Sequence, residues 1–302
     1  LLATAAVALA WGYGHWRIQG LEARIRQAPA VKVAVVQGNI PQAEKWDPAF
    51  QIASTKQYIK LSGHLGPQKP DLIVWPETRT TFYLLHHQAL TRMVQPGVQN
   101  AGSAHIIGSP AVRKSDDGIA YFNSAYLLDP QGNPLARYDK AHLVPFGEYV
   151  PLEKWLRGLI AFFDLPMSAF TPGPIHQAPL RVGGFRVAPF ICYEIVYPDL
   201  VAQGARDAEV LITISNDSWF GSSIGPLQHL QIARVHSLAG QVVQHVAEVH
   251  VRHVAQGNQV READAAPRRI SGRFHNGDAR RAHPDWRSRR RPGRGNRGHG
   301  GW

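Results

Sequence analysis

The chain has 302 residues, of which 44% are hydrophobic, so it is long enough to bury a substantial core. Its one cysteine, Cys192, excludes a disulfide within the chain. The formal net charge of +11 is concentrated in residues 239–302, which hold 13 Arg, no Lys and 5 acidic residues and so supply +8 of it.

The first twenty residues predict a membrane helix of which only the end is present. Residues 1–10 are apolar or small apart from Thr4, and Trp11, Tyr13 and Trp16 follow. A bilayer-spanning helix needs ~20 apolar residues, so this run is too short alone. The aromatic rings suit the membrane–water interface. A signal-peptide remnant and a short buried helix are the alternatives, and residues 21–30 are expected to be a linker.

Apolar runs alternate with longer amphipathic stretches over residues 31–238, which predicts an α/β catalytic domain with these limits. Strands are expected at 31–37, 71–75, 105–109, 121–128, 185–191 and 210–215. Helices are expected at 48–65, 86–94, 198–206 and 228–238.

Three reactive side chains follow strand-like runs. Glu77 comes after Trp75 and Pro76, Lys140 lies in an extended stretch after residues 125–128, and Cys192 directly follows residues 185–191. In α/β sheets ligands bind beyond the carboxyl ends of strands, so these exits suggest one site. Glu77 would act as the base, Cys192 as the nucleophile and Lys140 as the partner of the oxyanion, which is acyl transfer through a thioester.

Each of these residues also has an ordinary interpretation. Cys192 can be a small core side chain, and Glu77 and Lys140 can be solvated loop charges. The histidines His86, His87, His229 and His236 show no convincing metal-ligand spacing, and a solvated or packed pair is expected for the last two. No Gly-rich phosphate loop follows a strand, so neither a nucleotide nor another cofactor is expected.

Six short motifs nevertheless occur in order and carry a resemblance to a known family. They are VVQGNIP at 35–41, WPET at 75–78, YDK at 138–140, HLVPFGEYVP at 142–151, ICYE at 191–194 and SNDSWFG at 215–221. Together they resemble the nitrilase superfamily, with its carbon-nitrogen hydrolase domain, and within it the catalytic part of the bacterial apolipoprotein N-acyltransferases.

The resemblance implies a four-layer α-β-β-α sandwich and a Glu-Lys-Cys triad, which falls on Glu77, Lys140 and Cys192. Four further positions match residues that the family requires. Glu148 matches a second acid near the lysine, Tyr193 and Glu194 follow the nucleophile, and Trp46 lies in a matching aromatic position. From the residues alone, Trp46 and Tyr193 would be packing aromatics and Glu194 an acid in the first turn of a helix.

The implied reaction moves a fatty acyl chain from a phospholipid through a Cys192 thioester to the amino-terminal amine of a diacylglyceryl-cysteine lipoprotein. The expected partners are therefore a phospholipid donor, an apolipoprotein acceptor and the membrane. The implied location is the bacterial inner membrane, with the catalytic domain facing the periplasm. The apolar stretch at 156–165 is expected to form a lipid-facing loop, with a core or lid helix as the alternative.

The tail at 239–302 departs from the family. No family-like turn or core strand is recognisable after residue 239, apart from some apolar alternation at 242–254, and the composition becomes rich in Arg, Gly and His. We expect a basic tail that is disordered or out of frame, which leaves the sandwich incomplete at its C-terminal end. The tail lacks interleaved aromatics and a folded reading motif, so no nucleic-acid partner is expected.

Three functions remain open from the sequence. The first is the acyltransferase described above. The second is a soluble amidase of the nitrilase type that hydrolyses a small carbon–nitrogen substrate, or an inactive fragment of either enzyme. The third is a basic binding protein, which depends on the tail alone.

Overall fold

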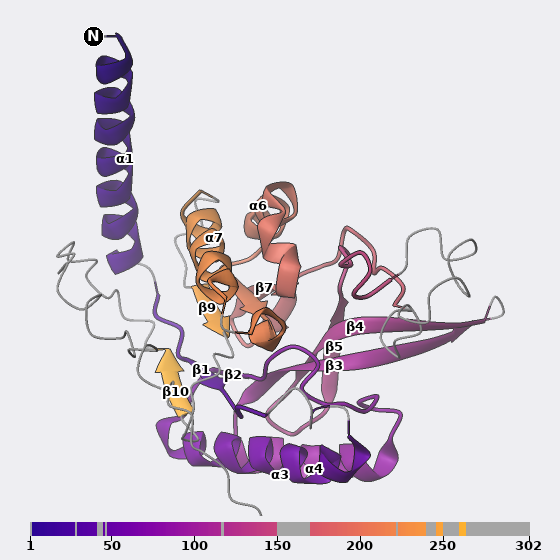
Figure 1. Ribbon diagram of the computed structural model, residues 1–302. Helices are drawn as coiled ribbons and strands as arrows, with labels where there is room; N and C mark the ends of the chain where they lie inside the picture. Colours follow the sequence, from indigo (N-terminus) through magenta and orange to yellow (C-terminus); the bar gives the residue numbers. More distant parts are fainter. Residues whose placement is uncertain are drawn as a thin grey trace, which may run out of the picture. The chain divides into compact units, whose positions relative to one another are not determined.

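A computed structural model describes residues 2–27, 29–40, 45, 47–115, 118–149, 170–221, 223–239, 246–249 and 260–263. Two sheets lie face to face, and each outer face is covered by a pair of helices (Figure 1). The expected α/β class and the α-β-β-α layering are both confirmed. The outer pairs are α3 with α4 on one side and α6 with α7 on the other.

The larger sheet has the strand order β10-β1-β2-β3-β4-β5. Strand β1 pairs in parallel with β2, and β2 with β3, whereas the other neighbours are antiparallel. The strands are β1 (Val33–Val36), β2 (Leu72–Val74), β3 (Ala104–Ser115), β4 (Gly118–Leu128), β5 (Pro134–Asp139) and β10 (Val260–Ala263).

The smaller sheet has the order β6-β7-β8-β9, and β7, β8 and β9 run in parallel. Its strands are β6 (Leu180–Val182), β7 (Phe185–Ile191), β8 (Val210–Ile214) and β9 (Val246–Val249). A short 3-10 helix, η3 (Cys192–Val196), directly follows β7, and another, η4 (Asp217–Phe220), follows β8. The parallel order therefore brings the carboxyl ends of β7 and β8 to one edge.

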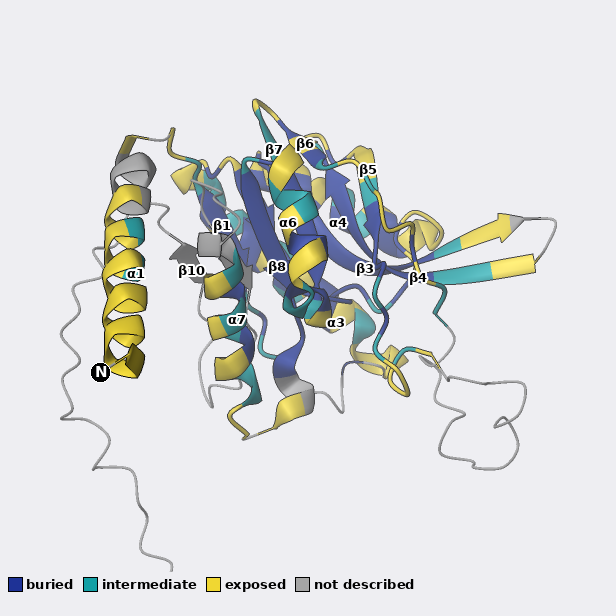
Figure 2. Cartoon of the chain, turned by 90° about the horizontal axis from the view of Figure 1, so that it is seen from above, coloured by how far each residue is buried: buried dark blue, intermediate teal, exposed yellow. Residues whose placement is uncertain are grey.

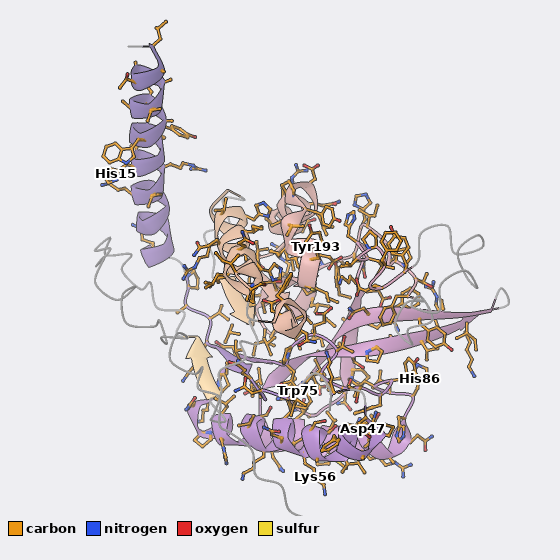
Figure 3. The ribbon with its side chains drawn as sticks, in the orientation of Figure 1. His15, Asp47, Lys56, Trp75, His86 and Tyr193 are labelled. Carbon is orange, nitrogen blue, oxygen red and sulfur yellow. The ribbon has the colours of Figure 1, made fainter. Side chains whose placement is uncertain are left out.

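Helices α3 (Pro48–Leu65) and α4 (Gln88–Ala101) cover the larger sheet. The Asp47 side chain accepts a hydrogen bond from the Ala49 N–H and so caps the start of α3, where Pro48 suits the first turn. Trp75, labelled in Figure 3, is buried between this helix and the sheet, and its ring N–H donates to Ser62 at 2.9 Å. This bond satisfies the only polar group of a large aromatic side chain in the core.

Side-chain alternation along β1 explains the layering. Val33 and Val35 belong to the core between the sheets, whereas Ala34 and Val36 face the helix layer. A strand covered on both faces is a continuous apolar run, because both sets of alternating side chains are buried. Figure 2 shows the central strands of both sheets as buried along their length, with the exposed residues on the helices and at the hairpin tip.

Helices α6 (Pro198–Asp207) and α7 (Gly225–Ala239) cover the smaller sheet. Leu200 and Val201 of α6 and Ala233 of α7 pack against Ala188, Phe190 and Leu211 of the strands. Each of these helices follows a strand whose carboxyl end carries a 3-10 turn. The outer layer thus also fixes the loops at the carboxyl edge of the sheet.

The limits of α3 and β7 match the sequence predictions. The other predicted elements are present with shifted ends: β3 ends six residues and α4 seven residues later than predicted, and β5 and β6 were not predicted. The main difference concerns the tail. Strands β9 and β10 are ordered parts of residues 239–302, which we expected to be a largely disordered or out-of-frame tail. The physical reason is that short runs rich in Val and Ala can extend existing sheet edges despite the surrounding Arg-rich sequence.

Helix α1 (Leu2–Gln27) continues beyond residue 20, where we expected a linker to begin. Its apolar and aromatic side chains are exposed, among them Leu9 and Trp11, which are each 74% exposed. Among the described residues, no helix combines the length and the apolar character that crossing a membrane requires.

Three sequence predictions lie outside the described residues. They concern Trp46, the apolar stretch at 156–165 and the remainder of the tail beyond β9 and β10.

Candidate active site

The three candidate residues follow three different strands. Glu77 follows β2, Lys140 comes directly after β5, and Cys192 comes directly after β7. Two of them are therefore contributed by the larger sheet and one by the smaller sheet. The site lies where the carboxyl ends of these strands meet, as expected for ligand sites in α/β folds.

Glu77 is buried, and its carboxylate and main-chain carbonyl both have hydrogen-bond partners. Its Oε1 accepts a hydrogen bond from Asn123 Nδ2 at 2.9 Å, and its Oε2 accepts one from the Asn216 N–H at 3.0 Å. Lys45 Nζ lies 3.4 Å from its main-chain carbonyl. The chain at Pro76 passes so close to β3 that only Gly108 fits there, since a Cβ would lie 2.2 Å from the Pro76 carbonyl oxygen.

Lys140 lies between two carboxylates. Its Nζ is 2.7 Å from Glu148 Oε2 and 3.7 Å from Glu77 Oε1, and its side chain is 1% exposed. Asn123 joins the same group, because its Nδ2 donates to Glu148 Oε1 at 2.8 Å as well as to Glu77. The amide orientation agrees with Thr78, whose hydroxyl faces the Asn123 Oδ1 at 3.5 Å.

The charge of Lys140 is favoured by this arrangement. Burial acts against the ammonium, but Glu77 and Glu148 outweigh it and raise the pKa of Lys140 above its ordinary value. An ammonium whose charged form is favoured by neighbouring carboxylates is suited to stabilising a negative oxygen. It is not suited to acting as a base.

Cys192 has a strained backbone. Its φ is +54°, in the left-handed region that a residue with a Cβ rarely adopts. The residue is partly exposed, at the turn between β7 and η3. Such a sharp turn presents the side chain beyond the end of its strand, as in the nucleophile elbows of α/β-hydrolases.

The surroundings of the thiol favour its protonated form. Burial raises the pKa of Cys192 to about 12, and the carboxylates of Glu77 and Glu148 reinforce this, whereas Lys140 and a hydrogen bond with Ser215 oppose it. These interactions place Glu77, Lys140 and Cys192 in one electrostatic environment. A thiol with a raised pKa needs a base at the moment it attacks.

Glu194 connects the strand ends of the two sheets. Its Oε1 accepts from the Tyr138 hydroxyl and from the N–H groups of Ala141 and His142, at 3.0, 2.7 and 3.1 Å. Its Oε2 accepts from the Ile191 N–H at 2.8 Å. Burial raises the pKa of Glu194 to about 7, although the Ile191, His142 and Ala141 N–H groups and Lys140 act in the opposite direction.

Tyr193 has a different environment from Glu194. Its side chain is 44% exposed and projects beside the helices of the smaller sheet (Figure 3). Its ring lies edge-on to Tyr197 with centroids 6.0 Å apart. The structure therefore places Glu148 and Glu194 inside the hydrogen-bond network and Tyr193 at its surface.

Several residues in this network were not predicted from the sequence. Asn123 is a lone amide inside the apolar strand β4, and a buried polar residue in such a run is the signal that could have found it. Lys45 is a second buried lysine close to Glu77. Burial, with the charge of Arg79, lowers the pKa of Lys45 to about 7, against the opposing effect of Glu77 and Cys192.

The histidines of α7 are packed, which is one of the two interpretations left open by the sequence. His229 Nε2 lies 3.0 Å from the Cys192 carbonyl oxygen, and His236 Nδ1 lies 2.7 Å from that of Ile195. Over the described part of the chain, no group of three or more His, Cys, Asp or Glu side chains is arranged to hold a metal ion.

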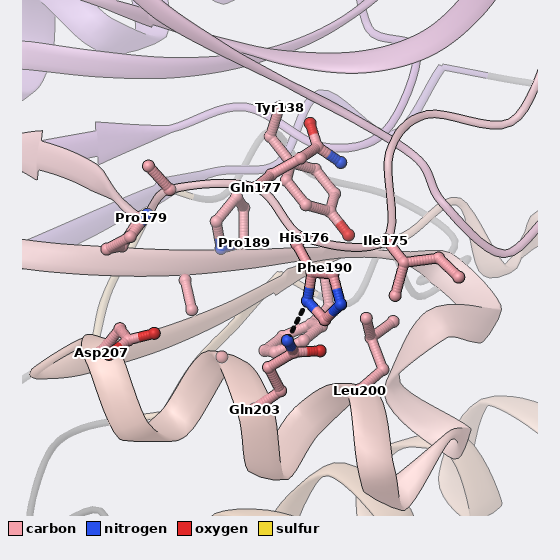
Figure 4. A pocket seen from close by; sticks show the side chains of 13 residues that line it. Tyr138, Ile175, His176, Gln177, Pro179, Pro189, Phe190, Leu200, Gln203 and Asp207 are labelled. Carbon is pink, nitrogen blue, oxygen red and sulfur yellow. Dashed lines mark hydrogen bonds between the residues drawn. The ribbon is translucent and has the colours of Figure 1, made fainter.

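A pocket lies beside this network, between α6 and the segment before β6 (Figure 4). Tyr138 forms part of its wall, and His176 and Gln203 are hydrogen-bonded across it. Its lining does not include Glu77, Lys140 or Cys192. It therefore adjoins the site through Tyr138 but does not contain the reactive groups.

Comparison with known proteins gives consistent results. The pattern of the carbon-nitrogen hydrolase family matches residues 32–247. The apolipoprotein N-acyltransferase of Pseudomonas paraeruginosa is 47% identical over 209 residues, which are 69% of this chain and 40% of that protein. The enzyme of that name from Allorhizobium ampelinum is 38% identical over 234 residues, covering 75% of this chain and 43% of that protein.

A solved carbon-nitrogen hydrolase from Helicobacter pylori superimposes with a TM-score of 0.51 at 17% identity, over 70% of this chain and 71% of that one. This likeness shows the nitrilase fold. The chain spans less than half the length of the two acyltransferases named above.

Proposed function

This chain belongs to the carbon-nitrogen hydrolase family, and we propose that it performs the catalytic steps of an apolipoprotein N-acyltransferase. The proposed donor is a phospholipid, and the proposed acceptor is the amino-terminal amine of a diacylglyceryl-cysteine lipoprotein. Glu77, Lys140 and Cys192 are the proposed catalytic residues. The observation that carries the proposal is the buried Lys140 ammonium between Glu77 and Glu148, in the electrostatic environment of the Cys192 thiol.

In the first half-reaction, the Glu77 carboxylate takes the thiol proton while the sulfur attacks the ester carbonyl carbon of the phospholipid. The carbonyl oxygen becomes negative in the tetrahedral intermediate, and Lys140 stabilises it. The carbon–oxygen bond then breaks, and the lysophospholipid alkoxide takes the proton from Glu77. An acyl thioester on Cys192 remains.

In the second half-reaction, the neutral α-amine of the acceptor attacks the thioester carbonyl. Its proton passes to Glu77, Lys140 again faces the negative oxygen, and the carbon–sulfur bond breaks. The departing thiolate recovers a proton from Glu77. The amide product carries the acyl chain, and the site returns to its starting state.

The remaining polar residues of the site support these roles. Asn123 donates to both Glu77 and Glu148 and so holds their carboxylates on either side of the lysine. Glu148 accepts from the Val144 N–H, which ties its loop to the ion pair. A site fixed in this way needs little reorganisation when charge develops on the substrate.

An assay with two substrates separates this proposal from the amidase alternative. The full chain is incubated with phospholipid vesicles and a synthetic diacylglyceryl-cysteine peptide, and the N-acylated peptide is quantified. Ammonia release from small aliphatic amides is measured in parallel. Acylation that disappears in Cys192→Ala supports the proposal. Ammonia release without acylation would support the amidase instead.

We further propose that α1 belongs to an inner-membrane anchor and that the catalytic domain faces the periplasm. The exposed side chains of Leu9, Trp11 and Trp16 support this, because they give the helix an apolar and aromatic surface. Protease digestion of spheroplasts that produce the protein tests it. The domain should be cleaved from outside, and protection until the inner membrane is lysed would contradict the orientation.

A further inference from the structure

Helix α7 is attached to the nucleophile turn through two histidines seven residues apart. His229 reaches the carbonyl oxygen of Cys192, and His236 reaches that of Ile195, two turns further along the same helix. A carbonyl oxygen can only accept a hydrogen bond, so the ring nitrogen that faces it carries the proton in each case. The two contacts are chemically alike, but only one of them involves the nucleophile residue.

His229 is oriented by a buried acid. Its Nδ1 lies 3.3 Å from Asp217 Oδ1, and the hydroxyl of Ser215 donates to the same carboxylate oxygen. The residues are 5%, 2% and 1% exposed, respectively. Asp217 begins η4, shortly after the end of β8, so the acid follows the strand next to the one that precedes Cys192. Because the carbonyl and the carboxylate both accept, the ring that makes both contacts carries a proton on each nitrogen, and the buried acid then fixes which way this imidazolium faces.

The contact from His229 fixes the peptide bond between Cys192 and Tyr193. This bond is planar and trans, so a carbonyl held on one side directs the N–H of Tyr193 to the opposite side. The Tyr193 N–H belongs to the first turn of η3, where N–H groups have no acceptor within the helix. The N–H that follows a nucleophile is a common donor to the oxyanion.

The contact also bears on the strain at Cys192. A left-handed φ at a residue with a side chain costs of order 1–3 kcal/mol and persists only where its surroundings hold it. The Glu194 carboxylate holds the N–H of Ile191, just before the turn, and His229 holds the carbonyl just after it. The turn is thus fixed on both sides of the sulfur-bearing residue.

We propose that Asp217 and His229 are positioning residues that hold the Cys192–Tyr193 peptide so that the Tyr193 N–H stabilises the oxyanion together with Lys140. The inference rests on the proposed use of Cys192 as the nucleophile. Neither residue touches the substrate in this account. His236 makes an equivalent bond to Ile195 and serves only to dock the helix.

Variants that differ in reach test the proposal. In His229→Gln the amide nitrogen can still reach the Cys192 carbonyl oxygen. In His229→Asn the side chain is one methylene shorter and its amide cannot reach that oxygen. We expect His229→Asn to lower kcat for acyl transfer by roughly 10- to 100-fold with little change in KM, because the Tyr193 N–H is then no longer held toward the oxyanion. His229→Gln should stay within about fivefold of the wild type, on the same reasoning, and Asp217→Asn should fall between the two.

The matched control is His236→Asn, which removes the same kind of bond from the same helix. It should lower the melting temperature about as much as His229→Asn does but leave kcat near the wild-type value. The proposal is overturned if the two asparagine variants lose activity equally. It is also overturned if His229→Gln is as impaired as His229→Asn.

A readout that does not depend on lipid transfer separates this inference from the proposed function. A long-chain aldehyde adds to the Cys192 thiol: the carbon–sulfur bond forms, and the thiol proton ends on the oxygen, which occupies the oxyanion position. Protection of Cys192 from iodoacetamide measures this addition. His229→Asn should need about tenfold more aldehyde, and His236→Asn should not. Equal protection in both variants would refute the positioning role, even if phospholipid proves not to be the donor.

Discussion

The two sheets contribute to the site in different ways. The larger sheet supplies what we call the charged half, Glu77, Asn123, Lys140 and Glu148, whose side chains hold one another by ion pairs and amide hydrogen bonds. The smaller sheet supplies the turn half, Cys192, Glu194, Asp217 and His229, in which side chains hold the main chain on both sides of the sulfur. Removing Glu77, Lys140 or Glu148 therefore removes a charge from the ion-pair group, whereas removing Glu194 or His229 removes a contact that fixes the main chain beside the sulfur.

The largest effect should come from the base in the charged half. Glu77→Gln keeps the shape of the side chain and can keep one of the two hydrogen bonds that Glu77 accepts from Asn123 and Asn216, but it cannot take a proton. Acyl transfer should fall by roughly 100- to 1,000-fold, which is typical for loss of a general base. Single-turnover formation of the thioester is the measurement. A loss confined to the second half-reaction would show that another group deprotonates the thiol.

The cation of the charged half should affect both activity and stability. Lys140→Met leaves Glu77 and Glu148 buried without their partner, so unfolding should become easier by about 3–5 kcal/mol, and the rate should fall by about 100-fold or more. Chemical denaturation and the acylation assay report these two quantities.

A double variant separates the two effects. Lys140→Met combined with Glu148→Gln removes one of the two uncompensated charges, so part of the stability should return while the activity does not. Recovery of activity in the double variant would contradict the role of Lys140 as the oxyanion partner.

Glu194 tests how the two halves are joined. It accepts four hydrogen bonds and donates none, from Tyr138, Ala141, His142 and Ile191. In Glu194→Gln one oxygen becomes an NH2 group that cannot accept, so at least one of these donors is left unsatisfied. We expect a loss of about 1–3 kcal/mol in stability, measured by thermal unfolding, and a fall of about tenfold in rate. A variant that is fully stable and active would show that the connection is dispensable.

The smallest predicted effect concerns thiol reactivity with pH. Burial and the Glu77 charge raise the pKa of Cys192 from 9.0 to about 12, so alkylation by iodoacetamide should keep increasing above pH 9. Glu77→Gln removes a negative charge and should lower the pKa of the thiol. At pH 9 the variant should therefore be alkylated several-fold faster than the wild type, although it transfers acyl groups far more slowly. Slower alkylation of the variant would contradict this electrostatic account.

The sequence singled out more of the charged half than of the turn half. Glu77, Lys140 and Glu148 of the charged half were proposed from strand exits and family-like motifs, and so were Cys192 and Glu194 of the turn half, whereas Asn123, Asp217 and His229 were not. Asn123 was missed because one amide in an apolar strand has no meaning until strand pairing sets it beside Lys140 and the fold brings Glu77 and Glu148 to its side chain. His229 was left as a packed or solvated side chain, because no sequence pattern shows that a ring on α7 meets a carbonyl 37 residues away.

The fold likewise contains elements that the sequence predicted and elements that it did not. Strand β7 and helix α3 were predicted with their observed bounds, since each is a continuous pattern with clear limits. Strands β9 and β10 were not, because each is only four residues long and lies in an Arg-rich segment. Short edge strands depend on the neighbouring strand for their hydrogen bonds, and composition alone does not reveal that neighbour.

The central claim is that the thiol of Cys192 accepts an acyl chain with the help of the charged half. The most direct measurement is the mass of the intact chain after incubation with phospholipid of defined acyl composition, followed by peptide mapping. The account predicts an increase equal to one acyl group on the peptide that contains Cys192, absent in Cys192→Ala and strongly reduced in Glu77→Gln. A folded protein that gains no such mass, or gains it on another residue, would contradict the account.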